Sequence, residues 1–140
     1  LKNIENTDRR RRFEWISPAL SAEREVRDEF FRSLQRLENR EIESWVLTAL
    51  QALHHPLRRD VSEVYILPSL ELLTEIQSTG DIFFPGRWLT STLGNHVSVS
   101  AAGIVRNFLA QHPDYNNALR LKILQAADNL FKAEELLTKL

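Results

Sequence analysis

The feature that most constrains the fold of this 140-residue chain is the helical spacing of its apolar residues. In an amphipathic helix apolar side chains recur every three or four positions, whereas in a half-buried strand they alternate strictly with polar ones. The helical spacing recurs from residue 22 to residue 138, and strict alternation is confined to Val97–Ser100. The sequence therefore predicts an all-α fold.

Proline and glycine residues divide this pattern into three predicted pairs of helices, which cover about 22–54, 61–93 and 98–138. The pairs follow one another at a period of about 38–40 residues, near that of HEAT and armadillo repeats. Pro68 lies inside the third predicted helix and predicts a kink or a break there. The predicted architecture is an irregular array of antiparallel helix hairpins, a HEAT/armadillo-like α-α superhelix.

The same pattern predicts helix caps and a core. The candidate N-caps are polar residues that stand before apolar runs: Ser21, Ser98 or Ser100, and Asn116 or Asn117. The inward face of the first helix is expected to carry Val26, Phe30, Phe31, Leu34 and Leu37, and the last helix is expected to run without a break from about 117 to 138.

Residues 1–20 precede the first predicted cap. We expect them to form a connector from a preceding domain, with one helical turn around Arg9–Ile16, so that residues 21–140 form the helical-hairpin domain. The sequence contains no methionine, even at position 1. We therefore expect this chain to be a piece of a longer protein.

Composition argues against several classes of function. Lys and Arg number 18 and Asp and Glu 19, and this balance argues against a general nucleic-acid binder, which would carry an excess of basic residues. No apolar run approaches the roughly 20 residues of a membrane helix. The chain has no cysteine, which excludes disulfides, thiol catalysis and zinc-thiolate sites. Nothing in the sequence separates a cytoplasmic from a periplasmic location.

No catalytic motif is present. The four histidines are His54, His55, His96 and His112, and no pair has the H-E-x-x-H spacing that places two imidazoles and a carboxylate on one helix face. The serines near His96 lack the G-x-S-x-G context of a nucleophile elbow. The sequence therefore predicts no catalytic, cofactor-binding or metal-ligating residue, and we expect the isolated chain to bind no zinc.

Two segments are candidate surface contacts. The first is the run Arg9, Arg10, Arg11 and Arg12, which could meet phosphate or an acidic partner. Alternatively, these arginines pair with Glu5, Asp8 and Glu14, or with the acidic surface of a preceding domain. If the arginines pair with these carboxylates, they need have no role in binding a partner.

The second candidate contact is the pair Arg87 and Trp88, inside the aromatic segment 81–88. An exposed Arg87–Trp88 edge could line a surface that binds peptides. Alternatively, the segment is a hydrophobic connection between helix pairs, with Trp88 in the core. Burial of Trp88 in the core is the simpler interpretation, and contact with a peptide is the alternative.

Four strings of sequence resemble a known family: R-R-R-R-F-E-W-I-S-P-A-L-S (9–21), W-V-L-T-A-L-Q-A-L-H-H-P-L-R (45–58), D-I-F-F-P-G-R-W-L (81–89) and L-R-L-K-I-L-Q-A-A-D-N-L-F (119–131). In this order they resemble the C-terminal helical domain of bacterial zinc aminopeptidases of the aminopeptidase N family. The likeness extends from about Arg9 to Phe131. None of the four strings is a catalytic signature.

The resemblance implies a role inside a larger enzyme. Members of this family carry a thermolysin-like catalytic domain, whose zinc polarises the scissile carbonyl and activates water. Their helical domain closes over that catalytic domain and limits access to short or flexible peptides. By this resemblance the partners of the chain are the catalytic domain of the same polypeptide and its peptide substrates, and the zinc belongs to the parent enzyme.

A second hypothesis is a free-standing HEAT-like module that binds a partner protein. Either hypothesis predicts an exposed apolar surface, because a docking face must bury apolar area against its partner. The two differ in what precedes the chain. A zinc-peptidase motif upstream in the same polypeptide would favour the first hypothesis.

Overall fold

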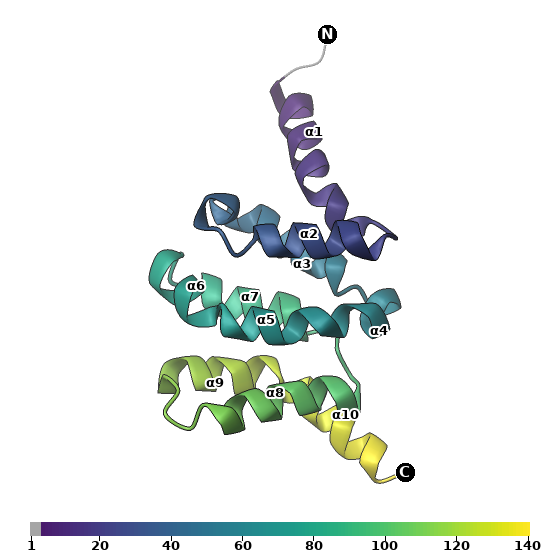
Figure 1. Cartoon of the computed structure of the whole chain (residues 1–140), viewed down its shortest axis with the longest axis vertical. Coiled ribbons are helices and arrows are strands. Elements are labelled where there is room, and N and C mark those ends of the chain that lie inside the picture. Colours follow the sequence, from purple (N-terminus) through teal and green to yellow (C-terminus); the bar gives the residue numbers. More distant parts are fainter. Residues whose placement is uncertain (1–3) are drawn as a thin grey trace. The chain divides into compact units, whose positions relative to one another are not determined.

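The computed structural model of the chain describes residues 4–140, with side chains from residue 6 onward (Figure 1). Its described residues form helices, turns and bends and no strand, which confirms the all-α prediction. Within this range no helix is both long enough and apolar enough to cross a membrane. The chain divides into two compact units, residues 1–53 and residues 54–140, which are treated separately below.

The first unit contains three α-helices and two 3₁₀ turns. They are α1 (Ile4–Ile16), η1 (Ser17–Leu20), α2 (Arg24–Ser33), η2 (Leu37–Arg40) and α3 (Glu43–Leu53). The turn η1 contacts all three helices, and its Ala19 is fully buried. Phe30, Phe31 and Leu34 are buried as the sequence predicts.

The segment expected to be a connector is instead a packed 13-residue helix, α1, followed by η1. Trp15 meets the ring of Phe30 edge to face at 5.2 Å and lies 6.0 Å from the ring of Trp45. The Arg12 guanidinium donates a hydrogen bond to Thr48 Oγ1 at 3.0 Å. These contacts tie α1 to α2 and α3, so residues 4–20 are part of the first unit.

Two details of this unit differ from the sequence prediction. The helix α2 ends at Ser33, where Asn39 Nδ2 donates to the Ser33 carbonyl, and Leu37 is therefore 51% exposed outside the core. The cap of α2 is Glu23, while Ser21 Oγ accepts a hydrogen bond from the Glu23 amide. The serine thus orders the residues that lead into the helix.

The second unit is a longer run of helices, shown from teal to yellow in Figure 1. Its elements are η3 (Pro56–Arg58), α4 (Arg59–Ser62), η4 (Glu63–Tyr65), α5 (Ile66–Glu71), α6 (Leu73–Thr79), α7 (Phe84–Leu93), α8 (Val99–Gln111), α9 (Asn117–Ala126) and α10 (Asp128–Thr138). The helix α7 contacts α5, α6 and α9, and α8 contacts α5 and α10.

Breaks in two predicted helices are the main departures in this unit. Pro68 lies in the first turn of α5, where its missing amide hydrogen costs nothing, and the break comes just before it, at η4. A second break, at Leu72 (φ −84°, ψ −8°), separates α5 from α6. Ala127 (φ −90°, ψ 1°) likewise divides the predicted last helix into α9 and α10. No proline or glycine marks either of these two breaks.

Two predicted caps are confirmed. Ser98 Oγ accepts a hydrogen bond from the Ala101 amide at the start of α8, and Asn116 Oδ1 accepts one from the Leu119 amide at the start of α9. Each satisfies an amide that has no acceptor within its own helix. These caps fix where the two helices begin.

Candidate functional site

The helix α7 carries one of the sequence-predicted contact segments. Trp88 is fully buried, its Nε1 donates to the Ser69 carbonyl at 3.1 Å, and its ring meets that of Phe84 edge to face at 6.0 Å. Trp88 therefore belongs to the core and offers no surface to a partner, contrary to the contact interpretation. Arg87, one position earlier on the helix, is exposed.

Arg87 lines a groove between α7 and α9, which we call the α7–α9 groove. Its walls include Phe83 and Arg87 on one side and Lys122, Gln125 and Ala126 on the other. Its volume is about 330 Å³, at the lower end of the range for ligand-binding clefts. The groove therefore has room for a few side chains of a partner.

The α7–α9 groove is basic and partly apolar. Two of its lining residues, Arg87 and Lys122, are cationic, and none is acidic. The Arg87 guanidinium lies 5.6 Å from the centroid of the Phe83 ring, which is 65% exposed. Among the described residues neither cation forms an ion pair, in contrast to Arg106, which pairs with Glu134 at 2.5 Å. Such a surface favours a carboxylate or another anion.

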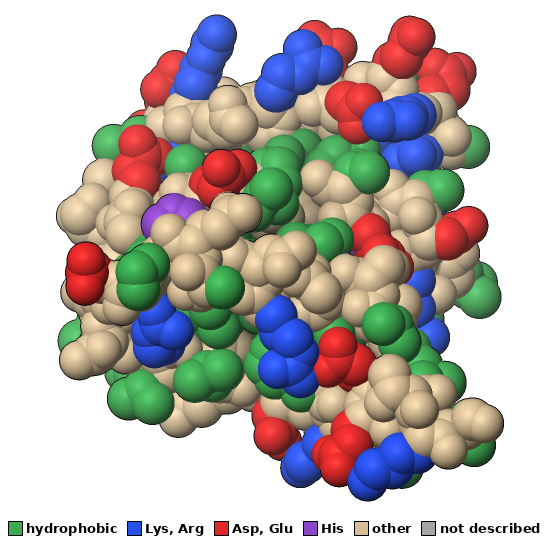
Figure 2. Space-filling view, turned by 60° about the horizontal axis from the view of Figure 1, so that its bottom comes forward, with side chains coloured by type: hydrophobic (Ala, Val, Ile, Leu, Met, Phe, Trp, Pro, Cys, Tyr) green, Lys and Arg blue, Asp and Glu red, His purple; other side chains and the backbone are tan. Residues whose placement is uncertain are grey.

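The apolar character continues along the surface of α9 and next to α7. Leu121 is 59% exposed and Leu124 40%, and both line a neighbouring depression that shares Gln125 with the groove. Ile82, just before α7, is 79% exposed. On the face seen in Figure 2, hydrophobic side chains are interspersed with both basic and acidic ones. Apolar side chains exposed together in this way are typical of a contact surface.

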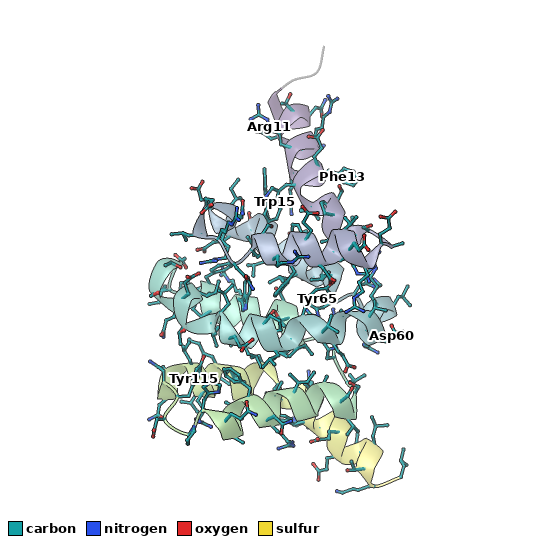
Figure 3. The ribbon with its side chains drawn as sticks, in the orientation of Figure 1. Arg11, Phe13, Trp15, Asp60, Tyr65 and Tyr115 are labelled. Carbon is teal, nitrogen blue, oxygen red and sulfur yellow. The ribbon has the colours of Figure 1, made fainter. Side chains whose placement is uncertain are left out.

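The other predicted contact segment, Arg9–Arg12, lies on α1 in the first unit, and all four arginines are exposed. Arg11 and Phe13 point away from the helix into solvent (Figure 3). Within the described side chains these arginines form no ion pair with Asp8 or Glu14, while the side chain of Glu5 lies outside the described residues. Among the side chains from residue 6 onward, no carboxylate pairs with this run.

A second polar cluster of the second unit is buried. His54 Nδ1 and His96 Nε2 share a hydrogen bond of 2.8 Å, and both side chains are inaccessible to solvent. The His54 ring also meets the Tyr65 ring edge to face at 6.4 Å, and Tyr65 is labelled in Figure 3. The remaining ring nitrogens, His54 Nε2 and His96 Nδ1, are buried with no hydrogen-bond partner.

Burial controls the protonation of this pair. It lowers the pKa of His54 from 6.5 to about 3, and the neighbouring His96 adds to the effect. The pKa of His96 is also lowered, mainly by burial, although the nearby Glu63 carboxylate opposes the shift. Both imidazoles are therefore neutral at pH 7, and one donates to the other.

Three sets of contacts hold the linker between α7 and α8 against residues 54–63, and we call this group the linker clamp. They are the His54–His96 hydrogen bond, the hydrogen bond from Arg59 Nε to the Asn95 carbonyl, and the hydrogen bonds from the hydroxyls of Ser98 and Ser100 to the Glu63 carboxylate. No three His, Asp or Glu side chains of the described part are placed to hold a metal ion. The linker clamp thus joins residues 94–100 to residues 54–63.

Two of these features escaped the sequence analysis. Lys122 lies 35 positions after Arg87, and His96 lies 42 positions after His54. Neither pair has a motif spacing, because the juxtaposition depends on how separate helices pack.

Comparison with known proteins finds no match: no family model, curated protein or solved structure is significantly similar to this chain.

Proposed function

We propose that the chain is the non-catalytic C-terminal helical domain of a zinc aminopeptidase, a parent enzyme that removes N-terminal residues from peptides. In this role it packs on the catalytic domain of the same polypeptide and limits the access of substrates. The finer architecture in this proposal is an irregular HEAT-like array of helix pairs.

The observation that carries the proposal is the uncovered α7–α9 groove on a framework of helices. The groove combines exposed Phe83 with two cations that form no ion pair with any described residue, and this combination is better suited to contact with a polypeptide than to catalysis. The hydroxyls of Ser98 and Ser100 donate to the Glu63 carboxylate within the linker clamp, and the buried histidines are held neutral in the core. A contact role therefore agrees better with the geometry than a reaction does.

The resembling strings lie where they would shape such a domain. The string 81–89 leads into α7 and contains Phe83 and Arg87, and the string 119–131 spans α9 and the start of α10 and contains Lys122. Two of the four strings thus contribute the walls of the groove. The same groove also supports the alternative, a free-standing HEAT-like module that binds a separate protein.

The test is hydrolysis of aminoacyl chromogenic amides by the full-length natural gene product, with and without these 140 residues. We expect zinc-dependent hydrolysis by the full-length protein, abolished by a chelator and restored by zinc, because the metal activates the attacking water. We expect removal of the helical domain to alter the rate or the size range of the peptides cleaved, as measured on a series of peptides of increasing length.

The control is the 140-residue chain alone, which is expected to cleave none of these amides. Absence of zinc-dependent hydrolysis by the full-length protein would contradict the aminopeptidase proposal and favour the free-standing module. Unchanged rates and size range after truncation would contradict the proposed role in access.

A further inference from the structure

We propose that the α7–α9 groove binds an acidic segment of the catalytic domain on which this helical domain docks, with carboxylates on Arg87 and Lys122 and an apolar side chain against Phe83. This inference deepens the proposed function and rests on it. It names the chemistry of the partner, which the docking proposal leaves open.

Charge complementarity is the first argument. The groove carries two cations and no acidic residue, and neither cation is neutralised by a carboxylate in the described part of the chain. Three other cations of the same unit are neutralised locally: Arg106 pairs with Glu134, Lys132 with Asp128 at 2.8 Å, and Lys139 with Glu135 at 2.9 Å. The α7–α9 groove therefore has a positive charge that an outside carboxylate can neutralise.

The position of Arg87 on the Phe83 ring is the second argument. A cation held over an aromatic face loses less conformational freedom when it binds an anion, because its side chain is already partly ordered. The guanidinium can present two parallel N–H groups to a carboxylate, which a lysine cannot do. Arg87 is therefore the better anchor, and Lys122 adds a second positive charge across the groove.

The apolar surroundings are the third argument, because they favour a polypeptide over a small anion. Phe83 and Ala126 line the groove itself, and Leu121 and Leu124 lie in the adjoining depression. A single phosphate or acetate would leave these side chains exposed to water. An acidic segment that also carries a hydrophobic residue satisfies both the charges and the apolar area.

The space available is the fourth argument. Gly86 lies on the wall of the groove, and a Cβ atom added there would meet no atom within 4 Å. The groove is thus open at this point. It also supplies a blocking variant, because Gly86→Leu would place a side chain in the groove without a clash in the core.

The experiment measures fluorescence anisotropy of a labelled peptide of Glu and Asp residues with a central Leu-Phe pair, titrated with the 140-residue chain. The expected result is saturable binding that weakens as salt rises, since exposed charges are screened. A peptide with Gln and Asn in place of the acidic residues should bind at least about tenfold more weakly, which is the effect of losing about one strong charged contact.

Variants of the chain locate the site. Arg87→Gln and Lys122→Gln should each weaken binding of the acidic peptide by about tenfold, and Gly86→Leu should abolish it by occupying the groove. Lys139→Gln removes the same charge from the distant end of α10 and should leave the affinity unchanged. Circular dichroism of each variant checks the fold. Equal affinity of the wild type and Arg87→Gln would overturn the assignment of the groove.

Two further measurements identify what binds in the α7–α9 groove. In the full-length gene product the groove is expected to be filled by the protein's own acidic segment, so the labelled peptide should bind it at least about tenfold more weakly than it binds the isolated chain. Equal binding to both proteins would overturn this occupant and point to a separate polypeptide. A single-stranded oligonucleotide that displaces the peptide at equal concentration would overturn an acidic polypeptide in favour of nucleic acid.

The outcome of this experiment is distinguishable from that of the hydrolysis test. Failure of the peptide to bind the isolated chain contradicts the inference about the groove but does not contradict the aminopeptidase proposal, which the hydrolysis assay tests separately. Absence of hydrolysis contradicts the aminopeptidase proposal even if the peptide binds the groove.

Discussion

Replacement of Trp88 by alanine is expected to lower the free energy of unfolding by about 3–5 kcal/mol, the usual cost of emptying a large core site. Trp88 is fully buried on α7, where it contacts Phe84 and donates a hydrogen bond to the Ser69 carbonyl. Alanine would leave a cavity and would also deprive that carbonyl of its partner. The cavity cannot collapse easily, because α7 contacts α5, α6 and α9 at once.

The measurement is urea unfolding of the whole chain, followed by far-UV circular dichroism. Trp88→Phe keeps most of the volume and removes the N–H donor, so we expect a smaller loss of about 1–2 kcal/mol. The matched control is Arg87→Ala, its exposed neighbour on the same helix, with a change within about 0.5 kcal/mol. A loss below about 1 kcal/mol for Trp88→Ala would show that this site is not packed in solution.

The second unit is expected to lose stability in acid through its buried histidine pair. The folded state lowers the pKa of His54 from 6.5 to about 3, whereas the unfolded chain keeps the ordinary value. Above pH 6.5 both states hold His54 neutral, so this group contributes no pH dependence. Between pH 6.5 and about 3 only the unfolded state binds the proton, and folding becomes less favourable as the pH falls.

The size of this effect follows from the separation of the two pKa values. Each unit of pH below 6.5 costs about 1.4 kcal/mol, so His54 alone is expected to remove about 2–3 kcal/mol between pH 7 and pH 4.5. The lowered pKa of His96 acts in the same direction. The charged and titratable groups around the pair are Glu63, Arg59 and Tyr65; the Glu63 carboxylate favours a charged His96, and Arg59 opposes it.

The measurement is urea unfolding at several pH values, with fluorescence of Trp88 as the probe after Trp15 and Trp45 are replaced by phenylalanine. A double variant, His54→Gln with His96→Gln, should show a flatter dependence on pH, whatever its stability at pH 7. His55→Gln changes the exposed neighbour and should keep the dependence of the parent. Equal slopes for the double variant and the parent would contradict the assignment to the buried pair.

Much of the fold follows from the sequence, because helices depend on local spacing and local caps. Ser98 and Asn116 begin their helices as expected, and Pro56 marks the end of α3. The breaks at Leu72 and Ala127 were missed because no proline or glycine stands at either position. Only one turn of α1, around Arg9–Ile16, was predicted, because most of this helix is polar and shows no apolar stripe.

The candidate site was predictable only in part. Arg87 stood out because it lies in an aromatic segment, but the choice between a core and a surface position for Trp88 required the structure. Lys122 could not be found from spacing, because α7 and α9 come together only through the fold. The histidine pair could not be predicted either, because its two members also come together only through the fold. In the sequence, His54 resembles a polar helix end shortly before a proline.

The linker clamp has a consequence for the order in which this chain folds. Its contacts join residues that are 35 to 42 positions apart, so each of them closes a loop of about that length. Closing such a loop in an unfolded chain costs roughly 3 kcal/mol of entropy, which no hydrogen bond within a helix has to overcome. The turn between α7 and α8 is therefore expected to form after the helices on either side of it. The topology of the chain, rather than local sequence preference, makes this a late step.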